Sequence, residues 1–210
     1  MCMALPKLFS FRRCPYAMRA RMALYQARIA LDLIEVELKN KPELMLKLSP
    51  KGTVPVLVQS SGEVLDESRD ILFWALERND PDTWLAAGLD PINGLIDECD
   101  QIFKPWLDRY KYHVGYPEHS PEYYRSQALL TLSAWETRLR QSEFLLGSSP
   151  GAADVALFPF VRQFANVDRA WFDSQQDLQA LRNWLGYWLE DPMFAAVMDK
   201  RLEFSFSEAP

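Results

Sequence analysis

The stretch LPKLFSFRRCPYAMRARMALYQA, residues 5–27, places a cysteine at the point where a short apolar strand gives way to a helix. Leu5 to Phe11 has the apolar content of a buried strand. Pro15 to Ala27 carries apolar residues at helical spacing and begins with a proline, which suits the first turn of a helix. The sequence therefore predicts that Cys14 lies at the N-terminus of the first helix.

That position favours a reactive cysteine. Unpaired N–H groups at a helix N-terminus, together with Arg12, Arg13, Arg19 and Arg21, lower the pKa of a thiol from about 8.5 by stabilising the thiolate. A second interpretation stays open at this stage, because most cysteines are small buried apolar residues. Each arginine, considered singly, is expected on a solvated helix face.

Strands and helices alternate through the first 80 residues. After the first strand and helix, the predicted segments are the strand 33–38, the helix 42–48, the hairpin strands 55–59 and 63–65, and the helix 66–78. The resulting order is β-α-β-α-β-β-α. We expect a small α/β domain over residues 1–80.

The remainder of the chain shows no convincing strand pattern. A cluster of Pro, Gly and Asn between residues 88 and 94 indicates a linker, which we assign to residues 81–90. The predicted helices are 92–112, 121–141, 152–166, 175–189 and 192–201. We therefore expect an all-helical domain over residues 91–210.

Composition and charge exclude several classes of protein. The chain has 210 residues, of which 49% are hydrophobic, and a net charge of -6, so we expect neither a disordered protein nor a nucleic-acid-binding surface. No apolar run reaches the roughly 18 residues that a membrane span needs, and the absence of a signal-peptide core predicts a cytoplasmic protein. Charge is uneven, with 12 Lys and Arg against 9 Asp and Glu in residues 1–78, and 11 against 20 in residues 79–210.

Cysteine and histidine are scarce. Three cysteines, Cys2, Cys14 and Cys99, form no C-x-x-C pair, and only two histidines are present. We therefore expect neither a disulfide framework nor a metal site. Cys2 and Cys99 are expected to play no part in the chemistry.

Four segments carry a resemblance to a known family. Cys14-Pro15-Tyr16-Ala17 resembles the active-site segment of omega-class and related bacterial glutathione transferases. Three further segments, Leu38 to Glu43, Gly52 to Leu57 and Asp66 to Ile71, resemble those of the same family in order and spacing. The resemblance covers residues 5–78, and over the helical half it rests mainly on Ala153 to Phe158.

The resemblance implies a fold and a set of site residues. The fold would be a thioredoxin-like N-terminal domain followed by an all-α domain. Cys14 would be the nucleophile that forms a mixed disulfide with glutathione. The residues expected to bind glutathione are Pro15, Tyr16, Leu38, Lys41, Val54, Pro55, Glu67 and Ser68.

Three of those residues have implied roles and ordinary alternatives. Lys41 would approach the glycyl carboxylate, although by itself it is a surface lysine. Val54, before a proline that is cis in the family, would pair its backbone with the peptide, whereas a proline there could also simply mark the start of a strand. Ser68 opens a helix whose N–H groups can hold the γ-glutamyl carboxylate, or it is an ordinary cap.

Four residues of the helical half are also candidates for a role in binding or in structure. Phe103, Trp106 and Tyr110 are candidates for the apolar wall of a co-substrate pocket, although core packing is the default for such residues. Asp154 is expected to be structural. Gly151 stands where the family usually has Ser or Thr, so we expect a weaker helix start than the full capping pair would give.

These observations predict a glutathione-dependent thiol transferase or reductase. Ala17 stands where a dithiol glutaredoxin has its second cysteine, so a monothiol cycle is implied. The expected partners are glutathione as co-substrate, a small electrophilic or disulfide substrate, no metal, and a second copy of the chain in a homodimer. Two alternatives remain: a non-enzymatic interaction protein resembling stringent starvation protein A, and a conjugating or isomerising transferase.

Overall fold

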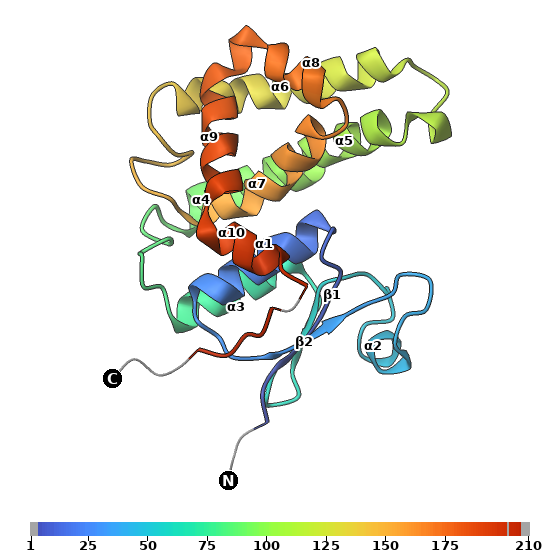
Figure 1. The fold of residues 1–210 in the computed structure, drawn as a ribbon, viewed down its shortest axis with the longest axis vertical. Helices are drawn as coiled ribbons and strands as arrows, with labels where there is room; N and C mark the ends of the chain where they lie inside the picture. The colour runs from blue at the N-terminus through green and yellow to red at the C-terminus, as the bar shows by residue number, and fades with distance from the viewer. Residues whose placement is uncertain (1–3, 201, 207–210) are drawn as a thin grey trace. The chain divides into compact units, whose positions relative to one another are not determined.

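The computed structural model describes residues 4–200 and 202–206 of the chain. Residue contacts divide the chain into two compact units. The first unit comprises the chain up to Thr83 together with the segment that begins at Asp191, and the second comprises Trp84–Glu190. Figure 1 traces both units, and each is described here by itself.

A four-stranded sheet forms the centre of the first unit. Its strands are β1 (Lys7–Ser10), β2 (Asp32–Glu35), β3 (Val56–Val58) and β4 (Val64–Leu65), in the order β2-β1-β3-β4. β1 runs parallel to β2 and antiparallel to β3, and β4 runs antiparallel to β3. The predicted alternation of strands and helices in this unit is confirmed.

Four helices accompany the sheet, namely α1 (Pro15–Gln26), α2 (Glu43–Leu48), α3 (Ser68–Arg78) and α10 (Pro192–Met198). α1 packs against both α3 and α10, as Figure 1 shows. A separate small core joins α2 to the sheet, because Met45 packs with Phe9, Val36 and Val56. Burial of these apolar side chains, at about 25 cal/mol per Å² of area, is the main force holding the layers together.

Strand direction brings four chain segments to one edge of this sheet. β1, β2 and β4 point the same way, and β3 points the opposite way. The segments that leave β1, β2 and β4 therefore emerge at the edge where the segment before β3 enters. Cys14, Val54 and Ser68 all belong to segments that meet at this edge, although they are far apart in the sequence.

The second unit is built from helices. They are α4 (Leu89–Asp97), the π-helix η1 (Glu98–Phe103), α5 (Lys104–Lys111), the 3-10 helix η2 (His113–Gly115), α6 (Pro121–Leu139), α7 (Ala152–Ala165), α8 (Arg169–Ser174), the 3-10 helix η3 (Gln176–Leu178) and α9 (Gln179–Glu190). α7 is its centre, since nearly all of its residues are buried. Together the two units confirm the predicted fold class, an α/β domain followed by helices.

Two details of the second unit differ from the prediction. The predicted helix 92–112 begins earlier, at Leu89, and contains the π-helical turn η1. α8 was not predicted, because a six-residue helix carries too little periodicity to be recognised. It is nevertheless capped, since Asp168 Oδ1 accepts a hydrogen bond from the Trp171 N–H over 3.0 Å.

The end of the chain groups differently from the predicted helical domain of residues 91–210. α10 and residues 202–206 belong with the first unit, where the Leu31 N–H donates to the carbonyl oxygen of Phe204 over 3.1 Å. The Tyr25 and Phe204 rings also meet edge to face, with centroids 6.2 Å apart. In the predicted linker, Trp84 is buried against Trp188 of the second unit.

None of the helices in the described part of the chain is long and apolar enough to cross a membrane.

Candidate functional site

Cys14 occupies the N-cap position of α1 with an extended backbone, as its place in the sequence predicts. Its N–H donates to the carbonyl oxygen of Phe11 over 2.9 Å, and its own carbonyl accepts from the Met18 N–H, also over 2.9 Å. The side chain is half-buried. The N-cap position lies beside the unpaired N–H groups of the first helical turn, and their partial positive charge favours negative charge there.

The segment before β3 meets this cysteine. Cys14 Sγ lies 3.8 Å from the carbonyl oxygen of Val54, in a weak hydrogen bond. The Val54-Pro55 peptide bond is cis. Val54 is half-buried, and Pro55 is buried where the chain enters β3. The nucleophile candidate and the backbone expected to pair with a peptide are therefore in contact.

Lys41 lies beside the turn that precedes Val54. Gly52 has a φ of +63°, which residues other than glycine rarely adopt. A Cβ at this position would lie 3.6 Å from Lys41 Nζ and 3.2 Å from Leu46 Cδ2. Glycine thus lets the lysine side chain lie across the turn. Leu38, the other candidate from the segment after β2, is exposed over 47% of its surface.

The start of α3 supplies the third segment of the candidate site. Glu67 is the N-cap, and Ser68 is the first residue of the helix, buried at 3% exposure. Arg19 Nη1 of α1 donates to Ser68 Oγ over 3.2 Å. Ser68 and Cys14 are therefore connected through α1, which has Cys14 at its N-cap and Arg19 in its second turn.

A cluster of charged residues surrounds Glu67. Lys51 Nζ lies 2.5 Å from Glu67 Oε1 and 3.2 Å from Asp66 Oδ1, and Ser49 Oγ donates to Asp66 Oδ2 over 2.7 Å. The hydrogen bond from Ser49, more than the charge of Lys51, lowers the pKa of Asp66 although burial opposes it. Burial would lower the pKa of Lys51, but hydrogen bonds to the two carboxylates outweigh it and raise that pKa. Lys51 and Ser49 were not among the site residues predicted from the sequence.

The two arginines of α1 correct the prediction that they lie on a solvated face. Arg19 is 0% exposed and Arg21 is 1% exposed. Burial lowers the pKa of Arg21 to about 10, an effect that the charge of Glu35 opposes, so the guanidinium stays protonated at neutral pH. One signal was available in the sequence: both arginines lie within a helix whose other residues are almost all apolar.

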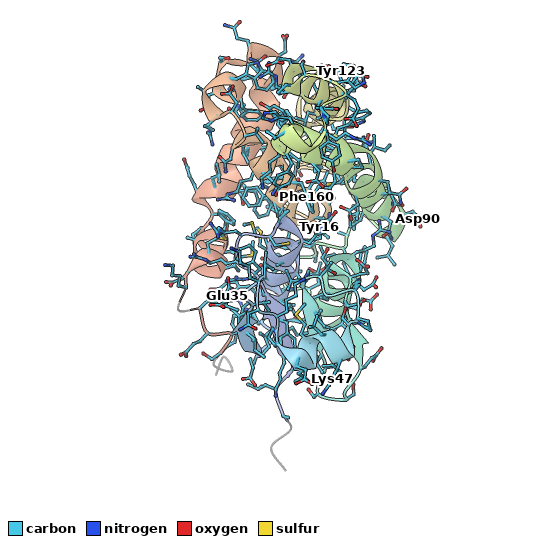
Figure 2. The ribbon with its side chains drawn as sticks, turned by 90° about the vertical axis from the view of Figure 1, so that its right-hand side faces the viewer. Tyr16, Glu35, Lys47, Asp90, Tyr123 and Phe160 are labelled. Carbon is cyan, nitrogen blue, oxygen red and sulfur yellow. The ribbon has the colours of Figure 1, made fainter. Side chains whose placement is uncertain are left out.

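Glu35 braces the segment that leads to Cys14. Its Oε1 accepts from the Arg12 N–H over 2.8 Å, and its Oε2 lies 3.8 Å from Arg21 Nη1. Arg12 Nη1 in turn donates to the carbonyl oxygen of Met198 at the end of α10, over 3.0 Å. β2, α1 and α10 therefore all hold the loop before the cysteine. Figure 2 labels Glu35 on β2 and Tyr16 on α1, and the Arg19 guanidinium lies 5.6 Å from the centre of the Tyr16 ring.

The three candidates for a co-substrate wall lie in the second unit and differ in burial. Phe103 is 0% exposed, with its ring centre 5.1 Å from that of Trp135, and Tyr110 is 4% exposed, 5.4 Å from Phe164. Burial raises the pKa of Tyr110. These two are core residues, in agreement with core packing as the default interpretation of such aromatic residues. Trp106 is half-buried, so of the three it has the most surface available to a ligand.

Asp154 is a buried residue in the first turn of α7, and its carboxylate accepts three hydrogen bonds. Its Oδ1 accepts from the Leu145 N–H over 2.9 Å and from Trp184 Nε1 over 2.8 Å, and its Oδ2 accepts from the Gly151 N–H over 3.0 Å. Burial raises the pKa of Asp154 to about 6, while the donors oppose this. Gly151 has no side chain to cap the helix in return, so only one half of the capping pair is present.

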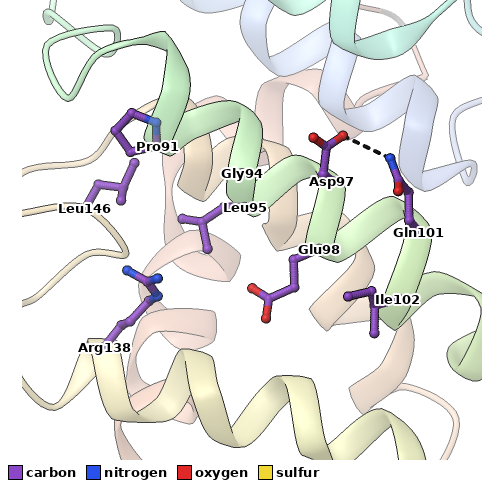
Figure 3. A pocket seen from close by; sticks show the side chains of 9 residues that line it. All are labelled: Pro91, Gly94, Leu95, Asp97, Glu98, Gln101, Ile102, Arg138 and Leu146. Atoms are coloured by element: carbon purple, nitrogen blue, oxygen red, sulfur yellow. Dashed lines mark hydrogen bonds between the residues drawn. The ribbon is translucent and has the colours of Figure 1, made fainter.

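A shallow groove of about 530 Å³ runs along the helical unit, between the α4–η1 segment and the end of α6 (Figure 3). Its polar side chains are Asp97, Glu98, Gln101 and Arg138, and Gln101 Nε2 donates to Asp97 Oδ1 over 3.2 Å. Glu98 also accepts from Trp135 Nε1 over 2.8 Å. None of the candidate site residues lines this groove.

Within residues 4–200 and 202–206, no group of three or more His, Cys, Asp or Glu side chains is arranged to hold a metal ion. Cys99 is buried, and Cys2 lies outside the described residues.

Two family models match the chain. Residues 8–84 match the model described as glutathione S-transferase, N-terminal domain, and residues 82–186 match the glutathione S-transferase, C-terminal domain.

Curated relatives match over shorter stretches. Mouse (Mus musculus) glutathione S-transferase omega-1 is 42% identical over 62 residues, which are 30% of this chain and 26% of the relative. Two rice (Oryza sativa subsp. japonica) proteins, named probable glutathione S-transferase DHAR2, chloroplastic, and DHAR1, cytosolic, are each 28% identical over 70% of this chain and over 50% and 64% of their own lengths. The aligned regions thus span about a quarter to two thirds of these relatives.

Solved structures share the fold over nearly the whole chain. A glutathione transferase from Phanerochaete chrysosporium, URE2P6, in complex with oxidized glutathione, superposes with a TM-score of 0.81 and 21% identity, covering 96% of this chain and 98% of that one. Glutathione transferase Omega 2C from Trametes versicolor has a TM-score of 0.75 and 19% identity, covering 94% of each chain. At this level of identity the likeness shows the fold alone.

Proposed function

This chain belongs to the glutathione S-transferase family, and from that premise we propose that it is a glutathione-dependent thiol transferase whose nucleophile is Cys14. One observation carries the proposal: a half-buried cysteine occupies the N-cap position of α1, and its sulfur contacts the carbonyl oxygen of Val54, the residue before a cis proline. A tyrosine or serine at this position could only donate a hydrogen bond to the sulfur of glutathione. A cysteine can form a disulfide with it.

Glutathione would bind along the edge of the sheet where these segments meet. Its γ-glutamyl carboxylate would lie at the start of α3, against the Ser68 hydroxyl and the unpaired N–H groups there, with Glu67 beside it. The backbone of Val54 would pair with the cysteinyl part of the peptide as an added strand does. Lys41 would approach the glycyl carboxylate, while Pro15, Tyr16, Leu38 and Pro55 would line the remainder.

The reaction would proceed by two thiol–disulfide exchanges. The Cys14 thiolate attacks the glutathionyl sulfur of a mixed disulfide, a new S–S bond joins Cys14 to glutathione, and the second thiol of the substrate leaves and takes a proton from water. A second glutathione thiolate then attacks the glutathione sulfur bound to Cys14. Oxidised glutathione leaves and the Cys14 thiolate is regenerated, so the protein needs no second cysteine.

The names of the relatives support a reductase over a conjugating enzyme. The mouse relative is an omega-class transferase, and the rice relatives carry the name DHAR. We therefore propose disulfides and dehydroascorbate as substrates. A homodimer and a cytoplasmic location complete the proposal; size-exclusion chromatography at micromolar concentration tests the first and cell fractionation the second.

Cys14→Ala tests the proposal most directly. With glutathione and a glutathione–cysteamine mixed disulfide as substrates, we expect this variant to lose thiol transfer and the wild type to gain the mass of one glutathione at Cys14. Cys99→Ala and Cys2→Ser are the matched controls, and both should keep full activity. Full thiol transfer by Cys14→Ala would overturn the proposal. If the wild type were not retained on a glutathione-affinity column, an interaction protein on this fold would become the better explanation.

A further inference from the structure

Arg19 is a charged side chain that lies inside the first unit. It is 0% exposed, and its guanidinium donates to Ser68 Oγ over 3.2 Å. Taking a guanidinium out of water costs several kcal/mol, and an apolar side chain of similar volume is often as good for stability. A role in packing therefore does not require an arginine at this position.

The hydrogen bond between Arg19 and Ser68 has a fixed direction. A guanidinium carries only donors, so Ser68 Oγ must be the acceptor. The hydroxyl hydrogen of Ser68 is then directed to another group. A carboxylate can accept this hydrogen bond, because it carries only acceptors. Ser68 also lies at the N-terminus of α3, whose unpaired N–H groups can donate to the same carboxylate.

The positive charge of Arg19 also favours an anion beside Ser68. A buried positive charge is screened less than one in water, so its attraction for an anion beside Ser68 is stronger. We propose that Arg19 is a positioning residue for glutathione: it orients the Ser68 hydroxyl as a donor to the γ-glutamyl α-carboxylate and thereby makes binding depend on that carboxylate. The inference rests on the proposed glutathione binding and adds the residue that sets its specificity.

A pair of ligands tests this role. S-methylglutathione is compared by calorimetry with the S-methyl form of 4-aminobutyryl-cysteinyl-glycine, which lacks only the α-carboxylate. We expect the wild type to prefer S-methylglutathione by about tenfold or more, the range for one charge-assisted hydrogen bond. Arg19→Met should abolish that preference and leave the affinity for the decarboxylated ligand unchanged, and Arg19→Lys should restore part of it.

Matched variants separate positioning from packing. Arg28→Met removes a charge from an exposed site of the same unit and should keep the wild-type preference. Ser68→Ala should lose the preference with Arg19 still in place, because the hydroxyl that Arg19 orients is absent, and Arg19→Lys tests Arg19 itself if Arg19→Met fails to fold. If the preference survives in Ser68→Ala or Arg19→Met, or if Arg19→Met weakens both ligands equally, the inference is overturned. A wild type that binds neither ligand would instead contradict the proposed function itself.

Discussion

The sulfur of Cys14 and the carbonyl oxygen of Val54 lie 3.8 Å apart and join two segments separated by 40 positions in the chain. The thiol can donate to that oxygen, whereas a thiolate has no hydrogen to donate. Ionisation of Cys14 therefore breaks the bond and leaves the Val54 carbonyl open to an N–H of an extended ligand. The protonation state of Cys14 and the availability of the Val54 carbonyl oxygen are thus coupled.

The first prediction concerns the reactivity of Cys14 as a function of pH. We expect its alkylation by iodoacetamide to reach half of its maximal rate below the value of about 8.5 for a free cysteine, because the α1 N-terminus stabilises the thiolate. Mass spectrometry of the modified peptide against pH measures this. Alkylation of this peptide should be absent from Cys14→Ala. If the midpoint of the alkylation rate against pH were at or above that of free cysteine, the expectation would be contradicted.

The second prediction concerns the buried charge of Arg21. Arg21 Nη1 lies 3.8 Å from Glu35 Oε2, and within the described residues Nε and Nη1 of Arg21 have no hydrogen-bond partner. We expect Arg21→Met to leave the free energy of unfolding unchanged or to raise it by about 1–2 kcal/mol, since the desolvation penalty disappears.

Removing the carboxylate should have the opposite effect. Glu35→Gln leaves the buried guanidinium without its counter-charge, so we expect a loss of about 1–3 kcal/mol, and Arg21→Met in the same chain should restore much of it. Urea unfolding of the two single variants and the double variant measures the coupling. If Glu35→Gln lowers the free energy of unfolding by the same amount in the wild-type chain and in the Arg21→Met chain, the two side chains do not interact.

The third prediction concerns Glu136, a buried carboxylate of α6. Its Oε1 accepts from Arg140 Nε over 2.8 Å and from the Ala180 N–H over 3.2 Å, and its Oε2 accepts from the Leu181 N–H over 2.7 Å. Glu136 thus caps the start of α9. Glu136→Gln replaces one acceptor by an NH₂ donor that faces another donor, so we expect a loss of about 1–3 kcal/mol.

Urea unfolding monitored by tryptophan fluorescence of the helical unit measures this loss. Glu143→Gln is the matched control at an exposed position and should change the free energy of unfolding by less than about 0.5 kcal/mol. If the two variants behaved alike, the capping role of Glu136 would be refuted.

The fourth prediction is a pH dependence of stability at Asp154. Its pKa is about 6 in the folded protein against 3.8 for an unperturbed aspartate, so between these two pH values the folded state binds more protons than the unfolded state. Stability from this group is therefore fully present below the unfolded pKa and is lost as pH rises through about 6. The shift corresponds to about 3 kcal/mol.

Asp154→Asn isolates that effect, because all other carboxylates are common to both proteins. We expect the wild-type free energy of unfolding, minus that of Asp154→Asn, to fall as pH rises from about 4 to about 7. Unfolding at a series of pH values measures the difference. A constant difference, or one that increases with pH, would show that Asp154 is not desolvated in this way.

Much of the first unit follows from local patterns. The turn between an apolar strand and a proline-led helix predicted Cys14 at the start of α1, and period-2 and period-3.6 spacing predicted the order of strands and helices. Such patterns depend on neighbours within a few positions in the chain. For the same reason the six residues of α8 went unrecognised and the start of α4 was placed too late.

Contacts between distant segments have no such local signature. The pattern of α1 predicts a helix, but whether Arg19 and Arg21 face water depends on α3 and α10, which cover α1 from positions about 50 and 180 residues further along the chain. The same holds for Phe103, whose burial against Trp135 requires α6 to pack beside η1. The residues alone indicated a helix that presents a reactive cysteine. The partners of its buried charges emerge only once the helices have packed, because burial and hydrogen bonding depend on proximity in space.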